Sequence, residues 1–270
     1  MAAPILLLGS GKMGGALLRG WLARGIAAAD IAVVEPNAEI AAAARALGVR
    51  VAGAVADLPA GFRPAIVVLA VKPQILSQAV QPLRPLVGPG TVVMSIAAGK
   101  TIANLEALFG PDAAVVRAMP NLPAAVGRGM QVAVANAKVA AAMRDRCDSL
   151  LAAVGEVAWI EDEALMDAVT AVSGSGPAYI FLLIECLAEA GVAAGLPAAL
   201  AMQLARTTVA GAGALAFEAK EPAAELRRNV TSPGGTTEAA LRVLMADDGL
   251  RPLMVRAVQA ATARSRELAG

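Results

Sequence analysis

A glycine-rich turn between an apolar run and a helical pattern constrains the fold of this chain more than any other feature. Ile5–Leu8 is continuously apolar, and after the turn apolar residues recur at helical spacing up to Leu22. In such a strand–turn–helix unit, glycines allow the tight turn, the close approach of backbone to a pyrophosphate, and packing of helix on strand. We therefore predict a dinucleotide-binding turn made of Gly9, Ser10, Gly11, Lys12, Met13 and Gly14.

An acidic residue follows the next apolar run, Ile31–Val34, where a ribose-binding carboxylate is expected. Glu35 lies about 20 residues beyond the last glycine of the turn. Its carboxylate can accept hydrogen bonds from both ribose hydroxyls and would repel a 2′-phosphate, so it favours NADH over NADPH. The alternative is a solvated acid at a strand end. We predict that Glu35, Pro36 and Asn37 contact the cofactor.

Apolar runs continue to alternate with helical segments. We predict strands at 65–71 and 91–96 and helices at 38–47, 74–86 and 102–108, an alternation that indicates a mostly parallel sheet. Ligands of such sheets lie at the carboxyl ends of the strands. The predicted cofactor contacts there are Ala70, Val71, Lys72, Pro73, Ala97, Ala98, Gly99 and Asn121. A surface lysine at position 72 and a plain rigid loop around Asn121 are the alternatives.

From Glu161 onward the periodicity is helical. We predict helices at 162–172, 178–194, 197–219, 238–245 and 252–268. Gly211 and Gly213 would each destabilise an isolated helix by about 1 kcal/mol, so they indicate tight contact between helices. The chain thus divides into an α/β domain, residues 1–159, and an all-helical domain, residues 160–270.

Composition excludes several classes of protein. Lys and Arg total 23 and Asp and Glu total 22, so the net charge is +1. The chain therefore lacks the excess of basic residues that binding to nucleic acid or to a membrane surface requires. The hydrophobic fraction of 57% against 17% charged residues indicates an oligomer with covered apolar surface. Glu185 and Glu189 interrupt the apolar stretch 180–196, and no basic segment precedes Ile5–Leu8. We expect no membrane span and a cytoplasmic location.

The reactive side chains are few. Histidine is absent, which excludes Ser-His and Cys-His catalysis and most catalytic zinc sites. Cys147 and Cys186 lie far apart in helical contexts, so we expect them to serve in packing, with no disulfide and no metal site. Proton transfer must then use hydroxyls, carboxylates, lysine or water.

A loop rich in hydroxyls and glycine, 230–237, precedes an apolar helical pattern. Gly234 and Gly235 can adopt positive φ, and the N–H groups at the following helix start attract a carboxylate or phosphate. The hydroxyls of Ser232, Thr236 and Thr237 can position or protonate the bound group. The loop is therefore a candidate small-anion site, and a glycine turn with a Ser/Thr N-cap is the alternative.

Several motifs together resemble the pyrroline-5-carboxylate reductase family, the last enzymes of proline biosynthesis. They are Ala168–Tyr179, Gly195-Leu196-Pro197 and Val230–Thr237, with Ala70–Pro73, Ser95–Gly99 and Met119-Pro120-Asn121 in the first domain. The resemblance covers nearly the whole chain. It implies a Rossmann-type domain joined to an all-α dimerisation domain, an interlocked dimer often built into larger rings, and an active site between the domains.

The resemblance also implies a reaction and its residues. Hydride from NADH or NADPH would pass to the C5 imine carbon of 1-pyrroline-5-carboxylate and give L-proline. The hydroxyl matching Thr237 lies nearest the ring nitrogen in this family, Glu163 matches a substrate-side position, and Asn229 lies close to the cofactor. The implied substrate-binding residues are Glu163, Ser232, Gly234, Gly235, Thr236 and Thr237, with Thr237 and Ser232 as catalytic hydroxyls.

The chain departs from the family pattern at three places, one of which is the absence of an Asn often found ahead of the Val-Lys-Pro strand, where Asp57 is the nearest polar residue. Arg227-Arg228 stands where Lys-Asp is common, and Glu35-Pro36-Asn37 replaces the polar or basic residues with which many members hold the NADP phosphate. Another small-substrate reductase, such as a β-hydroxyacid dehydrogenase or a different imine reductase, is one alternative function. Those enzymes need a helical lysine, and none occurs between Lys138 and Lys220. A dinucleotide sensor without turnover is the other.

Overall fold

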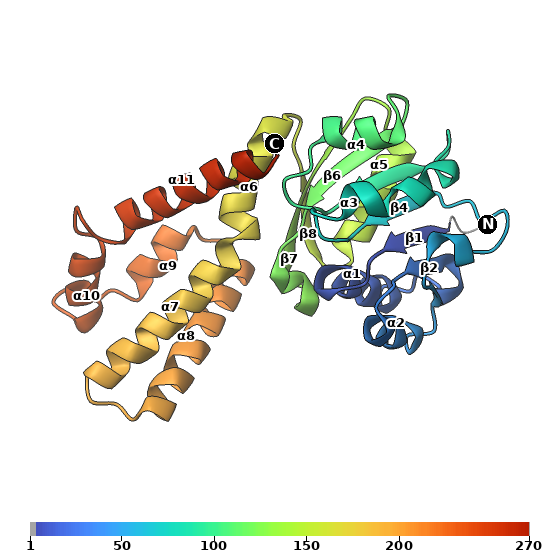
Figure 1. Ribbon diagram of the computed structural model, residues 1–270. Coiled ribbons are helices and arrows are strands. Elements are labelled where there is room, and N and C mark those ends of the chain that lie inside the picture. Colours follow the sequence, from blue (N-terminus) through green and yellow to red (C-terminus); the bar gives the residue numbers. More distant parts are fainter. Residues whose placement is uncertain (1–3, 270) are drawn as a thin grey trace. The chain divides into compact units, whose positions relative to one another are not determined.

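The computed structural model describes residues 4–269, which divide by internal contacts into two compact units. The first unit runs up to Gly174 and includes the residues from Thr262 onward, and the second is Ser175–Ala261. The first unit contains the sheet and the second is helical (Figure 1). The predicted fold class, an α/β domain followed by helices, is confirmed.

One sheet of eight strands forms the first unit, in the order β3-β2-β1-β4-β5-β6-β7-β8. All neighbouring strands run parallel except β6 and β7. The order reverses at β1, which pairs with both β2 and β4, and ligands of doubly wound sheets bind at such a point. The strands are β1 Ile5–Leu8, β2 Ile31–Val34, β3 Arg50–Ala52, β4 Ile66–Leu69, β5 Val92–Ser95, β6 Ala114–Met119, β7 Gly129–Ala135 and β8 Gly155–Trp159.

Helices cover both faces of this sheet. Those of the first unit are α1 Lys12–Ala23, α2 Ala38–Arg45, α3 Leu76–Ala79, α4 Ile102–Phe109, α5 Ala141–Ala152 and α6 Met166–Val169. Short 3-10 turns join them: η1 Ala28–Asp30, η2 Val55–Asp57, η3 Gln81–Leu86, η4 Leu122–Val126 and η5 Glu163–Leu165, and a π-helical turn, η6 Thr170–Gly174, follows α6.

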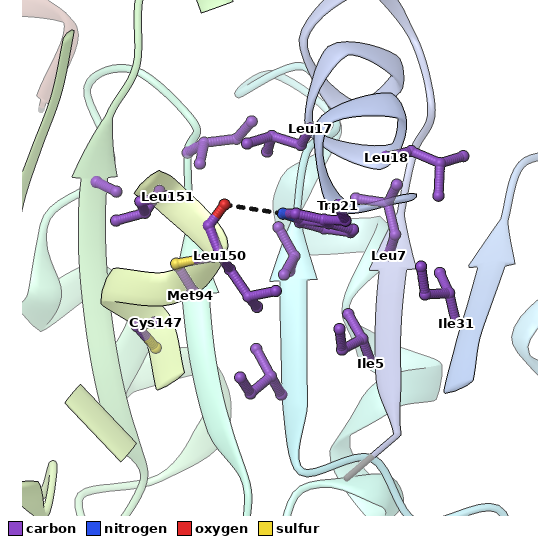
Figure 2. Close-up of a cluster of buried hydrophobic side chains, with 14 of the residues drawn as sticks. Ile5, Leu7, Leu17, Leu18, Trp21, Ile31, Met94, Cys147, Leu150 and Leu151 are labelled. Atoms are coloured by element: carbon purple, nitrogen blue, oxygen red, sulfur yellow. Dashed lines mark hydrogen bonds between the residues drawn. The ribbon is translucent and has the colours of Figure 1, made fainter. Parts of the chain in front are cut away.

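The core lies on the two faces of the sheet because β1 alternates its side chains between them. Ile5 and Leu7 join one apolar cluster, and Leu6 and Leu8 join the other. Trp21 of α1 is fully buried in the first cluster, and its indole N–H donates to the carbonyl oxygen of Leu150 at 2.9 Å (Figure 2). A strand buried on both faces reads as a continuous apolar run, which is why the sequence predicted β1 and β2 at their observed bounds.

The predicted helix at 74–86 is wrong. Helix α3 spans only Leu76–Ala79, and the 3-10 turn η3 replaces the remainder. Pro82 and Pro85 lie in that segment, and proline lacks the N–H that an α-helix needs in its interior. The predicted helix at 162–172 is likewise not a single α-helix, since it is divided among η5, α6 and the π-helical turn η6.

The second unit consists of α7 Gly176–Ala193, α8 Ala198–Glu218, α9 Ala223–Asn229 and α10 Thr236–Leu244, and α11 Leu250–Ala269 begins in it. Helices α7 and α8 form a hairpin that turns at Gly195, whose φ is +96°. A Cβ on Gly191 would lie 3.1 Å from Cβ of Ala201, so these two helices approach closely. Around Gly211 and Gly213 the prediction of tight contact is wrong within this chain, because an added Cβ meets nothing within 4 Å.

Helix α7 leaves a large apolar surface uncovered within the chain. Its side chains Ile180, Phe181, Leu182, Leu183 and Leu187 are between 41% and 58% exposed. The helical stretch Glu163–Ala193 contains an 18-residue window with a mean hydropathy of 1.5. By length and composition it could cross a membrane, a test that core helices of soluble proteins pass too. The expected absence of a membrane span therefore stays a prediction.

Candidate active site

The glycine turn between β1 and α1 has the backbone that a pyrophosphate site needs. Gly9 has φ of +87°, and a Cβ on Gly14 would overlap the carbonyl oxygen of Gly9. Gly11 caps α1, no side chain caps its first N–H groups, and a Cβ there would meet no atom within 4 Å. Uncapped N–H groups at a helix N-terminus attract anions. The residues present therefore fit the pyrophosphate of a dinucleotide.

Glu35 ties this turn to the end of β2. Its side chain is 7% exposed, Oε2 accepts the N–H of Ser10 at 2.9 Å, and Oε1 accepts the N–H of Asn37 at 3.0 Å. The alternative of a solvated surface acid is wrong. Asn37 in turn caps α2, because its Oδ1 accepts the N–H of Ile40 at 3.0 Å, while Pro36 is exposed. The contact of these residues with a cofactor stays a prediction.

The turn after β4 lies against the glycine turn. A Cβ added to Gly9 would lie 3.0 Å from both the Ala70 carbonyl oxygen and Cγ1 of Val71. The N–H of Ala70 donates to the Leu8 carbonyl oxygen at 2.8 Å, which fixes the end of β4 beside that of β1. Pro73 is half-buried and Lys72 is exposed. This exposure is compatible both with a contact to the cofactor and with a plain surface lysine.

The turn after β5, residues 97–101, begins with three small residues. Ala97 is buried and donates its N–H to Oγ of Ser95 at 3.3 Å, while Ala98 is exposed. Gly99 has φ of +71°, and a Cβ there would lie 3.1 Å from the carbonyl oxygen of Leu268 in α11. The two turns thus lie at adjacent carboxyl ends of the sheet, where the fold places a ligand, and the second presents small residues there.

An ion pair that the sequence analysis missed lies next to this turn. Nη1 of Arg117 is 2.7 Å from Oε1 of Glu163, and the same oxygen accepts the N–H of Ile102 at 2.9 Å. Glu163, implied above as a substrate-side residue, therefore also holds the first residue of α4. The sequence does contain a sign of this pair: Arg117 interrupts the apolar run of β6, and a buried charge requires a partner of opposite charge.

Asn121 has partners within the first unit. Its Nδ2 donates to the carbonyl oxygen of Ser173 at 3.2 Å and to Oγ of Ser173 at 3.3 Å, and its Oδ1 accepts the N–H of Met130 at 2.9 Å. The amide therefore joins β7 to the π-helical turn η6. Its contact with a cofactor stays a prediction. Residues 4–269 contain no cis peptide bond, so Pro120 follows a trans bond.

The loop 230–237 is a candidate anion site in which the N–H groups of both Gly234 and Gly235 already have acceptors, that of Gly235 being the carbonyl oxygen of Ser232 at 3.0 Å. Gly234 has φ of +72°, and its N–H donates to Oε2 of Glu238 at 2.7 Å. Gly235, with φ of −83°, caps α10, and no side chain caps its first N–H groups. Thr237 is half-buried, and Ser232 and Thr236 are exposed. A carboxylate of the chain itself thus binds where the sequence predicts that an anion binds.

The segment before this loop shows how the unusual Arg227-Arg228 pair is accommodated. Arg228 forms an ion pair with Glu225 one turn earlier on α9. Arg227 and Arg228 line an open hollow of about 460 Å³ with Thr231 and Glu238, and the carbonyl oxygen of Arg227 accepts the Thr231 hydroxyl at 2.6 Å. Asn229 ends α9 and is exposed.

The glycine turn and the doubly wound sheet define the class of dinucleotide-binding proteins, and comparisons with known proteins place the chain among its NAD(P)-dependent oxidoreductases. A family model described as NADP oxidoreductase, coenzyme F420-dependent, matches residues 4–99, and the model of pyrroline-5-carboxylate reductase dimerisation matches residues 163–268. The chain belongs to the pyrroline-5-carboxylate reductase family. It is 44% identical over 275 residues to the reductase of Pseudomonas aeruginosa, covering 100% of this chain and 98% of that protein.

More distant relatives and solved structures belong to the same family. The pyrroline-5-carboxylate reductase of Pisum sativum is 37% identical, over 97% of this chain and 94% of that protein. The structure of the Coxiella burnetii pyrroline-5-carboxylate reductase matches with a TM-score of 0.93 at 34% identity, covering 100% of both chains. That of the Plasmodium falciparum enzyme, with NADP bound, matches with a TM-score of 0.83 at 28% identity over 99% of this chain and 98% of that one.

Proposed function

We propose that this chain reduces 1-pyrroline-5-carboxylate to L-proline with a reduced nicotinamide dinucleotide, the final step of proline biosynthesis. The observation that carries the proposal is the full-length likeness to reductases of that name, at 44% identity. Both loops that the chemistry needs are present: the glycine turn of the first unit and the 230–237 loop of the second.

The two domains have different binding roles. Residues 1–159 bind the dinucleotide, and residues 160–270 carry the substrate loop and form the dimer. The N–H groups at the start of α1 hold the pyrophosphate, and the turns 70–73 and 97–99, with Asn121 and Asn229, contact the nicotinamide half. The bound nicotinamide supplies the hydride.

We propose NADH as the preferred cofactor. Glu35 keeps a carboxylate at the end of β2, fixed by two backbone N–H groups and 7% exposed. A 2′-phosphate beside this charge would be repelled, whereas ribose hydroxyls can donate to it. The P. falciparum relative is described with NADP bound, so the two cofactors must be compared directly in this chain.

The substrate loop holds the carboxylate of the imino acid. The N–H groups of Gly234, Gly235 and Thr236 bind that carboxylate, which displaces Glu238 and the Ser232 carbonyl oxygen from the first two. The Thr237 hydroxyl makes a hydrogen bond with the ring nitrogen, and Ser232 adds a second hydroxyl. Glu163 lies on the substrate side. A cyclic imine protonates readily and accepts hydride without a strong acid, so positioning supplies most of the rate enhancement. This explains how a chain without histidine can catalyse the reaction.

We further propose that the chain acts in the cytoplasm as a homodimer that assembles into a larger ring. The dimerisation model matches 163–268, the region in which α7 exposes its apolar side chains. A second copy would cover these side chains and occupy the open space beside Gly211 and Gly213.

Product identification tests the function. The purified chain is incubated with 1-pyrroline-5-carboxylate and NADH, and L-proline is measured by chiral chromatography. A β-hydroxyacid and a six-membered cyclic imine serve as comparison substrates. Proline formed in equal amount to the NADH consumed supports the proposal. A folded chain that binds NADH and forms no proline refutes it.

A further inference from the structure

A buried cation lies beside the turn that leads from β5 into α4. Arg117 of β6 pairs in register with Ser95, the last residue of β5, and its side chain is only 6% exposed. A guanidinium in such a place is costly unless a carboxylate pairs with it. Its partner is Glu163, at 2.7 Å, whose side chain is 28% exposed.

The paired carboxylate reaches the N-terminus of α4. Oε1 of Glu163 accepts the N–H of Ile102 at 2.9 Å, in addition to the Arg117 guanidinium. Thr101 and Asn104 satisfy two further N–H groups of this helix end by reciprocal capping, at 3.1 Å each. A carboxylate is favourable at a helix N-terminus because of the helix dipole. One oxygen of Glu163 therefore joins β6 to the first residue of α4.

This arrangement fixes the 97–101 turn at its α4 end. At its β5 end the N–H of Ala97 donates to Ser95, and in the middle Gly99 is packed against the Leu268 backbone. The turn lies at the carboxyl end of a central parallel strand, where the sheet places its ligand. It is thus held at both ends and along one side, and Arg117 supplies the charge that anchors the α4 end.

We propose that Arg117 is a positioning residue for hydride transfer: through Glu163 it fixes the 97–101 turn, which sets the place of the bound dinucleotide relative to the substrate. The inference rests on the proposed function. Arg117 itself is not expected to touch cofactor or substrate. Its loss loosens the turn, while the glycine turn and Glu35, which hold the other half of the dinucleotide, remain intact.

Kinetics of a set of variants test this role. In Arg117→Met, kcat falls about 100-fold, the loss typical of a misplacement of about 1 Å, while the Kd for NADH changes by less than about threefold. The kcat of Arg117→Lys lies between those of the wild type and Arg117→Met, because lysine keeps the positive charge but lacks the planar guanidinium with its paired N–H donors. The matched control is Arg144→Met, whose pair with Glu161 is 41% and 89% exposed and which keeps the wild-type kcat.

A double-mutant cycle tests whether Arg117 acts through Glu163. If it does, Arg117→Met combined with Glu163→Gln lowers kcat no further than the more severe single variant. A double variant whose loss is the product of the two single losses contradicts the proposal. So does an Arg117→Met protein with wild-type kcat.

Hydrogen exchange of the cofactor-free protein gives a readout that needs no turnover. Peptides covering residues 96–105 exchange faster in Arg117→Met and in Glu163→Gln, and peptides covering residues 5–20 do not. Unchanged exchange at 96–105 overturns the proposal. If Arg117→Met does not fold, the kcat values and the exchange rates at 96–105 of Arg117→Lys and Glu163→Gln test the proposal instead. If the wild type forms no proline, the proposed function fails, and the exchange rates still decide whether Arg117 holds the turn.

Discussion

Replacing Glu35 by Gln tests whether this carboxylate holds the dinucleotide-binding turn together. The substitution keeps the shape of the side chain and removes its charge. In the structure, the carboxylate accepts the N–H groups of Ser10 at 2.9 Å and Asn37 at 3.0 Å, and it is 7% exposed. A carboxamide has only one acceptor oxygen, so its NH₂ group must face one of these two donors.

The expected loss of stability in Glu35→Gln follows from the two hydrogen bonds. Hydrogen bonds to charged groups contribute about 1.5–3 kcal/mol, and a buried donor left without an acceptor costs about 1–3 kcal/mol. With one bond weakened and one lost, we expect the free energy of unfolding to fall by about 2–3 kcal/mol. At roughly 2–4 °C per kcal/mol for a domain of this size, Tm falls by roughly 5–10 °C.

Thermal unfolding followed by circular dichroism measures this effect. The matched control is Glu39→Gln, an exposed acid in the first turn of α2, which changes Tm by less than about 2 °C. NADH also binds more weakly to Glu35→Gln, because the Ser10 end of the turn is released. A Glu35→Gln protein that melts with the wild type would refute the claim that these two bonds stabilise the turn.

Three further predictions concern other parts of the chain. Gly14→Ala, whose Cβ overlaps the Gly9 carbonyl oxygen, weakens NADH binding at least about tenfold by calorimetry; unchanged affinity would mean that the turn can relax. Burial, and secondarily the Asp148 carboxylate, raises the pKa of the Cys147 thiol from 9.0 to about 12, so the unfolded chain loses this proton first, and stability present below pH 9 falls as pH rises towards 12. Denaturant unfolding at a series of alkaline pH values shows this loss in the wild type and less of it in Cys147→Ala. Glu238→Gln removes a charge that competes for the Gly234 N–H, so L-proline inhibits at concentrations a few-fold lower; weaker inhibition would contradict this competition.

The parts of the fold that the sequence predicted are those with one dominant local signal. Strands β1 and β2 are uninterrupted apolar runs buried on both faces, so their bounds were predicted to the residue. Strand β7 was missed because it carries a buried Gln131 and begins at a glycine, and β8 because its residues are mainly half-buried and lack a clear alternation. The helix predicted at 74–86 does not form at full length because Pro82 and Pro85 lack the N–H groups that an α-helix needs in its interior.

For the site, the sequence predicted positions but not partners. Glu35 was placed by its spacing from the glycines, yet its bonds to Ser10 and Asn37 depend on how two separate turns approach each other. The Arg117–Glu163 pair joins residues 46 positions apart, and only the folded sheet brings them together. The tight contact predicted at Gly211 is absent within one chain, where an added Cβ meets nothing within 4 Å, because the sequence does not say which surface a helical glycine faces.

The most direct test of the proposed activity is the steady-state oxidation of NADH and of NADPH by 1-pyrroline-5-carboxylate, for the wild type and for Thr237→Ala. Ser149→Ala serves as a control at an exposed hydroxyl on α5. We expect turnover with a higher kcat/KM for NADH, a loss of about 10- to 100-fold in kcat/KM in Thr237→Ala, and wild-type rates in the control. A preference for NADPH would contradict only the role of Glu35 in cofactor choice. No turnover with either cofactor, in a folded chain that binds dinucleotide, would contradict the central claim that the chain is a pyrroline-5-carboxylate reductase in activity as well as in family.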